Sequence, residues 1–499
     1  MESGSIYMRK NVLLISPHSS AKLNESRYVS PAPGIIRLAA YLNSNGHYAE
    51  AYDPNLHDLN NSYVDLHMKL LEEDWDIIGV SCLEETLVQD IENLWTASKL
   101  RPQALLVAGG IEAQYNYQTI LDKSPCKIVV TGEGEVPMEM ICNDTLYQNI
   151  PGIIFKNNAD PLTKEQFEFA SKQIPWGRIP YEDYWDYYLD KYEGKITDEI
   201  NDQIHTVRIF SKNRCPFLCK FCTSTNQLPD AIGRKASVVG ISTELLVTFI
   251  ETIHRMHPRV RTIYLTDDDF CINRIDVIEF CKQIIERKLD HLTYMCFARV
   301  TDLKLEMLQW MKKAGFRRLN IGVESFSNKV LEEIGKKYTE VQIVENLIHV
   351  KAVGIQAFLT AMLITPGSNL LDLEYTVHQL SQYAKDPFFT LGLAPAIRPT
   401  KGSEFYEMYH DFKTITTPIK GIRSPNKRPY LIKENKMIYA KDPYVKEIQI
   451  LYDSLEEKFL DEFINKNNIK HATYSNIAEA QLKLMKDCIE NIKDKYNLP

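Results

Sequence analysis

The sequence predicts an α/β protein with three parts: a doubly wound (Rossmann-like) domain, a partial (β/α)6 TIM-like barrel and a helical C-terminal domain. Short apolar runs alternate with amphipathic helices up to about residue 400, and glycines or polar residues follow most of the runs. Beyond that point the alternation stops. We expect the first domain over residues 1–150, a connector over 151–200, the barrel over 201–400 and the helical domain over 401–499.

The first domain contains five short apolar runs that are typical of buried parallel strands. They cover residues 11–16, 49–52, 76–81, 104–108 and 127–131. In doubly wound sheets the ligand lies beyond the carboxyl ends of the strands, where glycine allows close approach of the backbone. No G-x-G-x-x-G follows the first run, which argues against a dinucleotide site.

Turn and breaker residues follow in the connector, at 150–152 and again at 174–180. The aromatic-rich stretch 181–192 comes next. It either packs an interface, as aromatic stripes usually do, or covers a pocket.

The barrel is predicted from six further apolar runs, at 205–210, 262–266, 293–297, 318–323, 357–364 and 388–394. By analogy with closed eight-stranded barrels, polar residues at the strand ends are candidate site residues. These are Asp267-Asp268-Asp269, Arg299, Glu324-Ser325 and Thr365-Pro366-Gly367. The aspartates also fit a solvated loop or a helix N-cap. After residue 400, helices are expected at 442–463 and 477–496.

Three cysteines, Cys215, Cys219 and Cys222, follow the first barrel strand at C-x3-C-x2-C spacing. Three thiolates on one loop can hold three irons of a [4Fe–4S] cluster and leave the fourth without a protein ligand. A structural zinc site is the alternative, with His205 as the nearby fourth ligand. Unrelated buried thiols are a second alternative.

This loop, with Phe221 before its last cysteine, resembles the signature of the radical S-adenosylmethionine (radical SAM) superfamily. The resemblance implies a [4Fe–4S] cluster held by the three cysteines, with SAM chelated at the open iron and cleaved to a 5′-deoxyadenosyl radical. It implies SAM contacts from Phe221, Asp267, Asp268, Arg299, Glu324, Ser325 and Pro366. The Arg299 guanidinium suits a carboxylate. Asn213-Arg214 precedes Cys215, whereas many relatives have Arg-Gly there, which leaves the local turn in question.

The first domain resembles the cobalamin-binding domain that precedes many radical SAM barrels. The resemblance rests on its loops and implies cobalamin contacts from Pro33, Gly34, Ser81, Leu83, Glu84, Gly109, Gly110, Gly132, Glu133 and Gly134. A D-x-H-x-x-G loop is missing, so no histidine is evidently offered to cobalt. His18 does not lie in such a motif. The alternative is a domain that kept the fold and lost the cofactor.

These resemblances imply an enzyme, a cobalamin-dependent radical SAM methyltransferase acting on an unactivated carbon in natural-product (secondary-metabolite) biosynthesis. No catalytic side chain beyond the cluster ligands is expected. Alternatives are a non-methylating rearrangement or cyclisation with the same cofactors, and a non-catalytic metal-binding scaffold. A tRNA-modifying enzyme is disfavoured because no second three-cysteine set and no basic tail domain are visible.

Composition limits the partners. The net charge of −8 gives no sign of the basic surface with which proteins bind nucleic acid. No apolar run reaches membrane-span length, and no signal peptide is evident. We expect a cytoplasmic protein, because an Fe–S cluster requires a reducing compartment. Its expected partners are a small-molecule or peptide substrate and a flavodoxin- or ferredoxin-type electron donor.

Overall fold

The computed structural model describes residues 8–19, 30–59, 64–153, 161–191, 198–223, 237–398, 402–409, 412–423, 429–467 and 474–499. The chain forms two compact units. One comprises residues 1–214, 225–263 and 415–434. The other comprises residues 215–224, 264–414 and 435–499.

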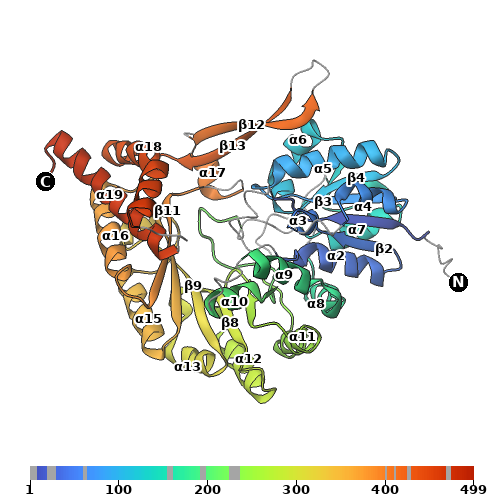
Figure 1. Cartoon of the computed structure of the whole chain (residues 1–499), viewed down its shortest axis with the longest axis horizontal. Coiled ribbons are helices and arrows are strands. Elements are labelled where there is room, and N and C mark those ends of the chain that lie inside the picture. The colour runs from blue at the N-terminus through green and yellow to red at the C-terminus, as the bar shows by residue number, and fades with distance from the viewer. Residues whose placement is uncertain are drawn as a thin grey trace. The chain divides into compact units, whose positions relative to one another are not determined.

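A parallel five-stranded sheet, drawn in blue in Figure 1, organises the first unit. Its strands are β1 (Asn11–Ile15), β2 (Tyr48–Tyr52), β3 (Ile77–Ser81), β4 (Leu105–Gly109) and β5 (Ile128–Val129). They lie in the order β2-β1-β3-β4-β5, and every neighbouring pair is parallel. The order reverses between β1 and β3, and open α/β sheets bind ligands at such a switch point.

Helices cover both faces of this sheet, as the continuous apolar runs require. Leu13 and Ile15 of β1 belong to one core, whereas Val12 and Leu14 belong to the other. The first core is completed by α4 (Leu66–Glu72), α5 (Leu87–Leu100) and α6 (Ile111–Lys123). The second is completed by α2 (Pro33–Ser44), α7 (Glu135–Cys142) and α8 (Lys164–Lys172).

The aromatic stretch of the connector forms α9 (Tyr181–Lys191), which lies between α8 and α10 (Asp198–Ile204) in the chain. Tyr181 and Trp185 are buried, and each contacts a histidine ring at 5.1 Å between centroids. The histidine beside Trp185 is His205. Its Nδ1 lies 3.0 Å from the Asn201 carbonyl and its Nε2 lies 3.4 Å from Arg259. These contacts favour packing for the aromatic stretch and engage His205 away from a zinc site.

A six-stranded sheet forms the barrel, in the order β11-β10-β9-β8-β7-β6. Its strands are β6 (Thr206–Ile209), β7 (Thr262–Leu265), β8 (Thr293–Arg299), β9 (Phe316–Glu324), β10 (Gln356–Ile364) and β11 (Phe389–Ala396). Each strand therefore neighbours the strand next to it in sequence, as in a (β/α)6 barrel. The connecting helices are α11 (Thr243–Met256), α12 (Arg274–Glu286), α13 (Leu305–Lys313), α14 (Asn328–Glu333), α15 (Glu340–Val353) and α16 (Leu370–Tyr383). The predicted fold class is confirmed.

The C-terminal part is helical, with one addition that the sequence analysis did not predict. Its helices are α17 (Glu404–Met408), α18 (Pro443–Lys466) and α19 (Tyr474–Tyr496). The addition is a two-stranded sheet of β12 (Phe412–Arg423) and β13 (Pro429–Ile438). Among the helices that the structure describes, none is long and apolar enough to cross a membrane.

Candidate functional site

Four loops gather at the carboxyl edge of the five-stranded sheet. Pro33 and Gly34 begin α2, Ser81 ends β3, Gly109 ends β4, and Gly132 and Gly134 follow β5. Leu83 and Glu84 are exposed directly after β3. The loops also contact one another, since the Cys82 amide donates to the Gly109 carbonyl at 2.8 Å. The predicted cobalamin contacts therefore share one edge, although their individual roles stay predictions.

Gly110 is required at this edge for its conformation. Its φ of +90° is unfavourable for residues with a side chain, and a Cβ there would lie 2.8 Å from the Cys82 carbonyl oxygen. We expect Gly110→Ala to lower the free energy of unfolding by about 1–3 kcal/mol, the usual range for local backbone strain. We also expect it to weaken cobalamin binding. Denaturant unfolding and spectroscopic titration with hydroxocobalamin measure the two effects. Gly46→Ala, just before β2, is the control: its φ is also positive (+89°), but nothing lies within 4 Å of a Cβ there, so cobalamin binding should be unchanged.

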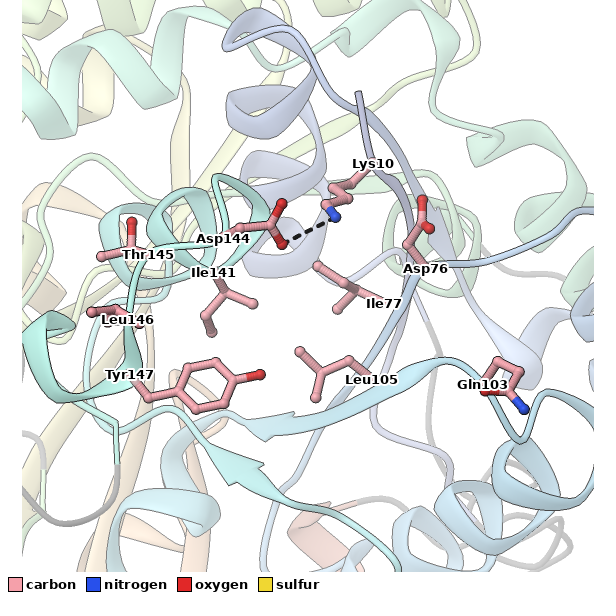
Figure 2. A pocket seen from close by; sticks show the side chains of 10 residues that line it. All are labelled: Lys10, Asp76, Ile77, Gln103, Leu105, Ile141, Asp144, Thr145, Leu146 and Tyr147. Carbon is pink, nitrogen blue, oxygen red and sulfur yellow. Dashed lines mark ion pairs between the residues drawn. The ribbon is translucent and has the colours of Figure 1, made fainter. Parts of the chain in front are cut away.

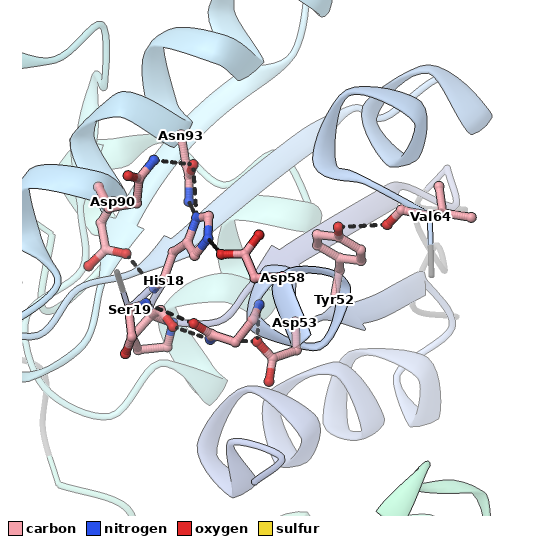
Figure 3. Close-up of polar contacts among 11 residues, drawn as sticks. His18, Ser19, Tyr52, Asp53, Asp58, Val64, Asp90 and Asn93 are labelled. Atoms are coloured by element: carbon pink, nitrogen blue, oxygen red, sulfur yellow. Dashed lines mark hydrogen bonds and ion pairs between the residues drawn. The ribbon is translucent and has the colours of Figure 1, made fainter. Parts of the chain in front are cut away.

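His18, just past β1 at the same edge, is held by side chains on several sides (Figure 3). Its Nε2 lies 2.8 Å from Asp58 Oδ2, and its Nδ1 lies 3.2 Å from Asn93 Nδ2. Its backbone amide donates to Asp90 Oδ1 at 2.9 Å. Both ring nitrogens are thus engaged within the protein, so His18 is not presented as a metal ligand.

Asp90 gives this network a pH dependence. It is completely buried, and burial raises the pKa of its carboxyl to about 8, despite a hydrogen bond from Thr86. The folded protein therefore keeps a proton that the unfolded chain loses near pH 4, so this carboxyl lowers stability as pH rises from about 4 to 8. We expect the free energy of unfolding of Asp90→Asn to fall less steeply with pH. Relative to the unsubstituted protein, the variant should be more stable at pH 8 than at pH 4 by at least about 1.4 kcal/mol, the value of one pKa unit. Denaturant unfolding of both proteins across this range measures it, and equal slopes would contradict the prediction.

The three predicted cluster ligands lie on a loop without regular secondary structure. Cys219 is buried, Cys215 and Cys222 are half-buried, and the Cys222 amide donates to the Cys219 carbonyl at 3.1 Å. Backbone hydrogen bonds from Lys220 to Ile334 and from Phe405 to Lys220 anchor the loop. Gly335 lies so close that a Cβ would be 2.9 Å from the Leu218 carbonyl oxygen.

The donor chemistry of this loop fits an iron–sulfur cluster. Burial raises the pKa of the Cys215 thiol to about 12, and the nearby Asp268 carboxylate acts in the same direction. A thiolate at this position therefore requires a metal cation in place of its proton. Within the described ranges, no three Cys, His, Asp or Glu side chains are gathered closely enough for a single metal ion. A cluster places each thiolate on a different iron, so its ligands stand farther apart.

Glu324, at the end of β9, is the most constrained of the predicted SAM contacts. Its φ is +66°, a conformation that is costly outside glycine and concentrates at functional sites. Its carboxylate lies 3.0 Å from Lys336 Nζ, and both side chains are nearly nine-tenths buried. Burial alone would lower the pKa of Lys336, but the Glu324 carboxylate outweighs it and keeps the pKa raised. The same ammonium lies 5.6 Å from the ring centroid of Phe221 in the cysteine loop.

Arg299, at the end of β8, is also brought to the cysteine loop. Its guanidinium carbon lies 3.8 Å from the ring centroid of Phe217 and 5.1 Å from that of Tyr338. Its Nε is buried and has no hydrogen-bond partner among the described residues. A buried unpaired N–H is costly, so this donor fits the carboxylate predicted for it.

The three aspartates of the loop after β7 lie in different environments. Asp267 is buried and Asp268 is exposed. Asp269 accepts from the Cys271 amide at 3.1 Å, as an N-cap does. Burial, and then the neighbouring Asp302, raise its pKa to about 8. Asp269 therefore has the capping role that was the alternative, whereas SAM contacts from Asp267 and Asp268 stay predictions.

Ser325 and Pro366 are tied into the fold. The Ser325 hydroxyl lies 3.0 Å from Thr376 Oγ1 and accepts from the Ser327 amide, and Ser325 is 1% exposed. Pro366 is buried, and its carbonyl accepts from the Lys441 amide at 2.9 Å. Any SAM contact from these two residues stays a prediction.

A cavity of about 500 Å³ opens beside Glu324, between the last barrel strands and α19. Its lining is mainly apolar and includes Phe358, Met362, Leu393 and Ile477. A second cavity, of about 450 Å³, lies at the amino ends of β1, β3 and β4 (Figure 2). It contains the Lys10–Asp144 ion pair and none of the predicted site residues. The first cavity is therefore the candidate for reactants.

Three residues beside the site were not predicted from the sequence. They are Lys336, Tyr338 and Asp302, which contact Glu324, Arg299 and Asp269 respectively. None of them ends an apolar run. Only their proximity in the fold reveals them.

Two domain families match the chain, in the expected order. The B12 binding domain matches residues 21–141, and the Radical SAM superfamily matches residues 209–380. An uncharacterised methyltransferase of Pyrococcus horikoshii is 23% identical over 74% of this chain and 77% of its own. An anaerobic magnesium-protoporphyrin IX monomethyl ester cyclase of Cereibacter sphaeroides is 27% identical over 61% of this chain, and the match spans about half (48%) of the cyclase.

A solved structure has the same fold along nearly the whole chain. It is the radical SAM methyltransferase TsrM of Kitasatospora setae, with cobalamin and a [4Fe–4S] cluster bound. The TM-score is 0.63 at 14% identity, and the match covers 97% of this chain and all of TsrM.

Proposed function

Because this chain belongs to the radical SAM superfamily and carries a B12-binding domain before its barrel, we propose that it methylates an unactivated carbon of a natural-product intermediate. It is a methyltransferase-like enzyme that uses a [4Fe–4S] cluster, SAM and cobalamin. One observation carries the proposal. The same chain has a parallel sheet whose strand order reverses between β1 and β3, and further on a three-cysteine loop directly after the first barrel strand. When bound, the three cofactors supply a hydrogen-abstracting radical and a transferable methyl group.

The residues of the chain have positional roles in this proposal. Cys215, Cys219 and Cys222 would hold the cluster, and the buried Arg299 Nε would bind the SAM carboxylate. Glu324, fixed by Lys336, would hold the SAM ribose or methionine end beside the 500 Å³ cavity. The apolar lining of that cavity would exclude water from the reacting carbon and so protect a radical.

The partners follow from the chemistry. The reaction requires a substrate and a reductant, and we propose a flavodoxin- or ferredoxin-type protein as the electron donor. A reducing compartment such as the cytoplasm suits the cluster. The acidic net charge gives no support for a nucleic-acid substrate.

Anaerobic reconstitution tests the proposal. The protein is loaded with iron, sulfide and hydroxocobalamin, desalted, and given SAM with a strong reductant. Retained corrin absorption together with 5′-deoxyadenosine is the expected result, and SAM labelled in its methyl group then reports methyl transfer to candidate substrates. Deoxyadenosine without retained cobalamin would overturn methylation by this route.

The match to a cyclase favours one alternative, a radical cyclisation with the same cofactors. The labelled SAM separates the two reactions. A product that forms with deoxyadenosine but carries no label from the methyl group would establish the non-methylating reaction.

A further inference from the structure

The turn that follows α14 is packed against the cysteine loop, within one compact unit. The Lys220 amide donates to the Ile334 carbonyl at 3.1 Å. A Cβ at Gly335 would lie 2.9 Å from the Leu218 carbonyl oxygen, and its φ of +77° is a conformation that glycine adopts without strain. The turn therefore places the next residue, Lys336, beside the cysteine loop.

Lys336 is fixed through its backbone and through its neighbours. Its amide donates to the Leu331 carbonyl at 2.9 Å, and this bond closes the last turn of α14. Two residues further on, the Tyr338 hydroxyl donates to the Gly322 carbonyl of β9 at 2.8 Å. A Cβ at Gly322 would lie 3.3 Å from Lys336 Nζ, so the ammonium lies directly over the backbone of this strand. It therefore has a defined position between β9 and the cysteine loop.

The ammonium of Lys336 is close to the predicted cluster ligands. It lies 5.6 Å from the ring centroid of Phe221, which directly precedes the last of the three cysteines. Burial lowers the pKa of Lys336, but the Glu324 carboxylate raises it, and a Cys219 thiolate acts in the same direction. The ammonium is therefore within electrostatic reach of a predicted ligand. Because the side chains of Lys336 and Glu324 are both nearly nine-tenths buried, solvent ions screen their charges little.

We infer that the buried Lys336 ammonium raises the reduction potential of the cluster and that the Glu324 carboxylate opposes this effect. The inference rests on the proposed function, since it requires a cluster on the three loop cysteines. A positive charge favours the cluster that has gained an electron, and nearby charge is one of the determinants of cluster potentials. Lys336 acts through the cluster and is in this sense a positioning residue. One buried ion pair would then set, in part, how strong a reductant the enzyme requires.

Substitutions in the pair should give a fixed order of midpoint potentials. Glu324→Gln leaves the ammonium without its counter-charge and should have a higher potential than the unsubstituted protein. Lys336→Met leaves the carboxylate alone and should have the lowest potential. The double variant Glu324→Gln/Lys336→Met should lie between the unsubstituted protein and Lys336→Met, because the ammonium is the charge that contacts Phe221. Lys337→Met is the matched control, since it removes an exposed ammonium at the next residue and should leave the potential unchanged.

The measurement is an anaerobic redox titration of each reconstituted protein, followed by electron paramagnetic resonance. The titration is made at neutral pH and without SAM, which separates the effect from any contact between Glu324 and SAM. Iron and sulfide per chain are determined for every variant. An ion pair that only stabilises the fold would leave the potential equal in all variants that retain the cluster. That result would overturn the inference, and so would shifts in the opposite directions.

A second comparison covers the case in which a single variant loses its cluster because one charge stays buried alone. The double variant lacks both charges, so it decides. A potential below that of the unsubstituted protein supports the inference, and an equal or higher potential overturns it. If the unsubstituted protein itself takes up no iron and sulfide, the proposed function fails, and the inference fails with it.

Discussion

Replacing Cys219 with alanine is expected to reduce reductive cleavage of SAM to the level of a protein-free control. The substitution removes one of three thiols that would hold the cluster, and two ligands on the loop leave a second iron open. The backbone should keep its course, because the hydrogen bond from Cys222 uses the carbonyl of residue 219 and not its side chain. Iron and sulfide per chain, visible absorption and chromatographic detection of 5′-deoxyadenosine measure the outcome.

The matched control is Cys281→Ala in α12, which removes a completely buried thiol elsewhere in the same unit. We expect it to cost about 1 kcal/mol of stability, as single substitutions usually do, and to leave cluster content unchanged. Deoxyadenosine formation by Cys219→Ala at the rate of this control would refute the ligand assignment. Zinc without sulfide in the unsubstituted protein would support the scaffold alternative.

Much of the fold was predictable because buried parallel strands leave a simple signal. The run 357–364 became Gln356–Ile364, and the helix expected at 477–496 became Tyr474–Tyr496. In both sheets the apolar runs are short, and most are followed by glycine or polar residues, so the strand ends could be located from the sequence. The pair β12 and β13 was missed because its segments mix lysines, threonines and two prolines, which resembles a loop as much as a strand.

The candidate site was predictable only in part, and the physical reason is the same at each position. Side chains at strand ends, such as Arg299 and Glu324, follow an apolar run and could be identified from the sequence. Their partners, Lys336 and Tyr338, come after α14, in a segment with no periodic signal. The left-handed backbone of Glu324 was also unpredictable, since sequence rules place glycine or asparagine in that region.

Breaking the Glu324–Lys336 pair is the second substitution with a large expected effect. Glu324→Gln leaves a buried ammonium, and Lys336→Met leaves a buried carboxylate, without the opposite charge at 3.0 Å. Removing one partner of a buried pair costs about 3–5 kcal/mol, because the remaining charge stays away from water. We expect losses of this size in the free energy of unfolding from denaturant titration, together with loss of SAM cleavage.

The double variant separates stability from function. With both charges absent, the desolvation penalty disappears, so Glu324→Gln/Lys336→Met should recover most of the lost stability. It should not recover SAM cleavage, because the carboxylate proposed to hold SAM is still missing. The exposed pair Lys458–Glu462 of α18 is the control, and breaking it should cost no more than about 0.5 kcal/mol. A double variant that cleaves SAM at the unsubstituted rate would show that Glu324 and Lys336 stabilise the strand end alone. The SAM site would then have to be built from Arg299 and the acidic loop.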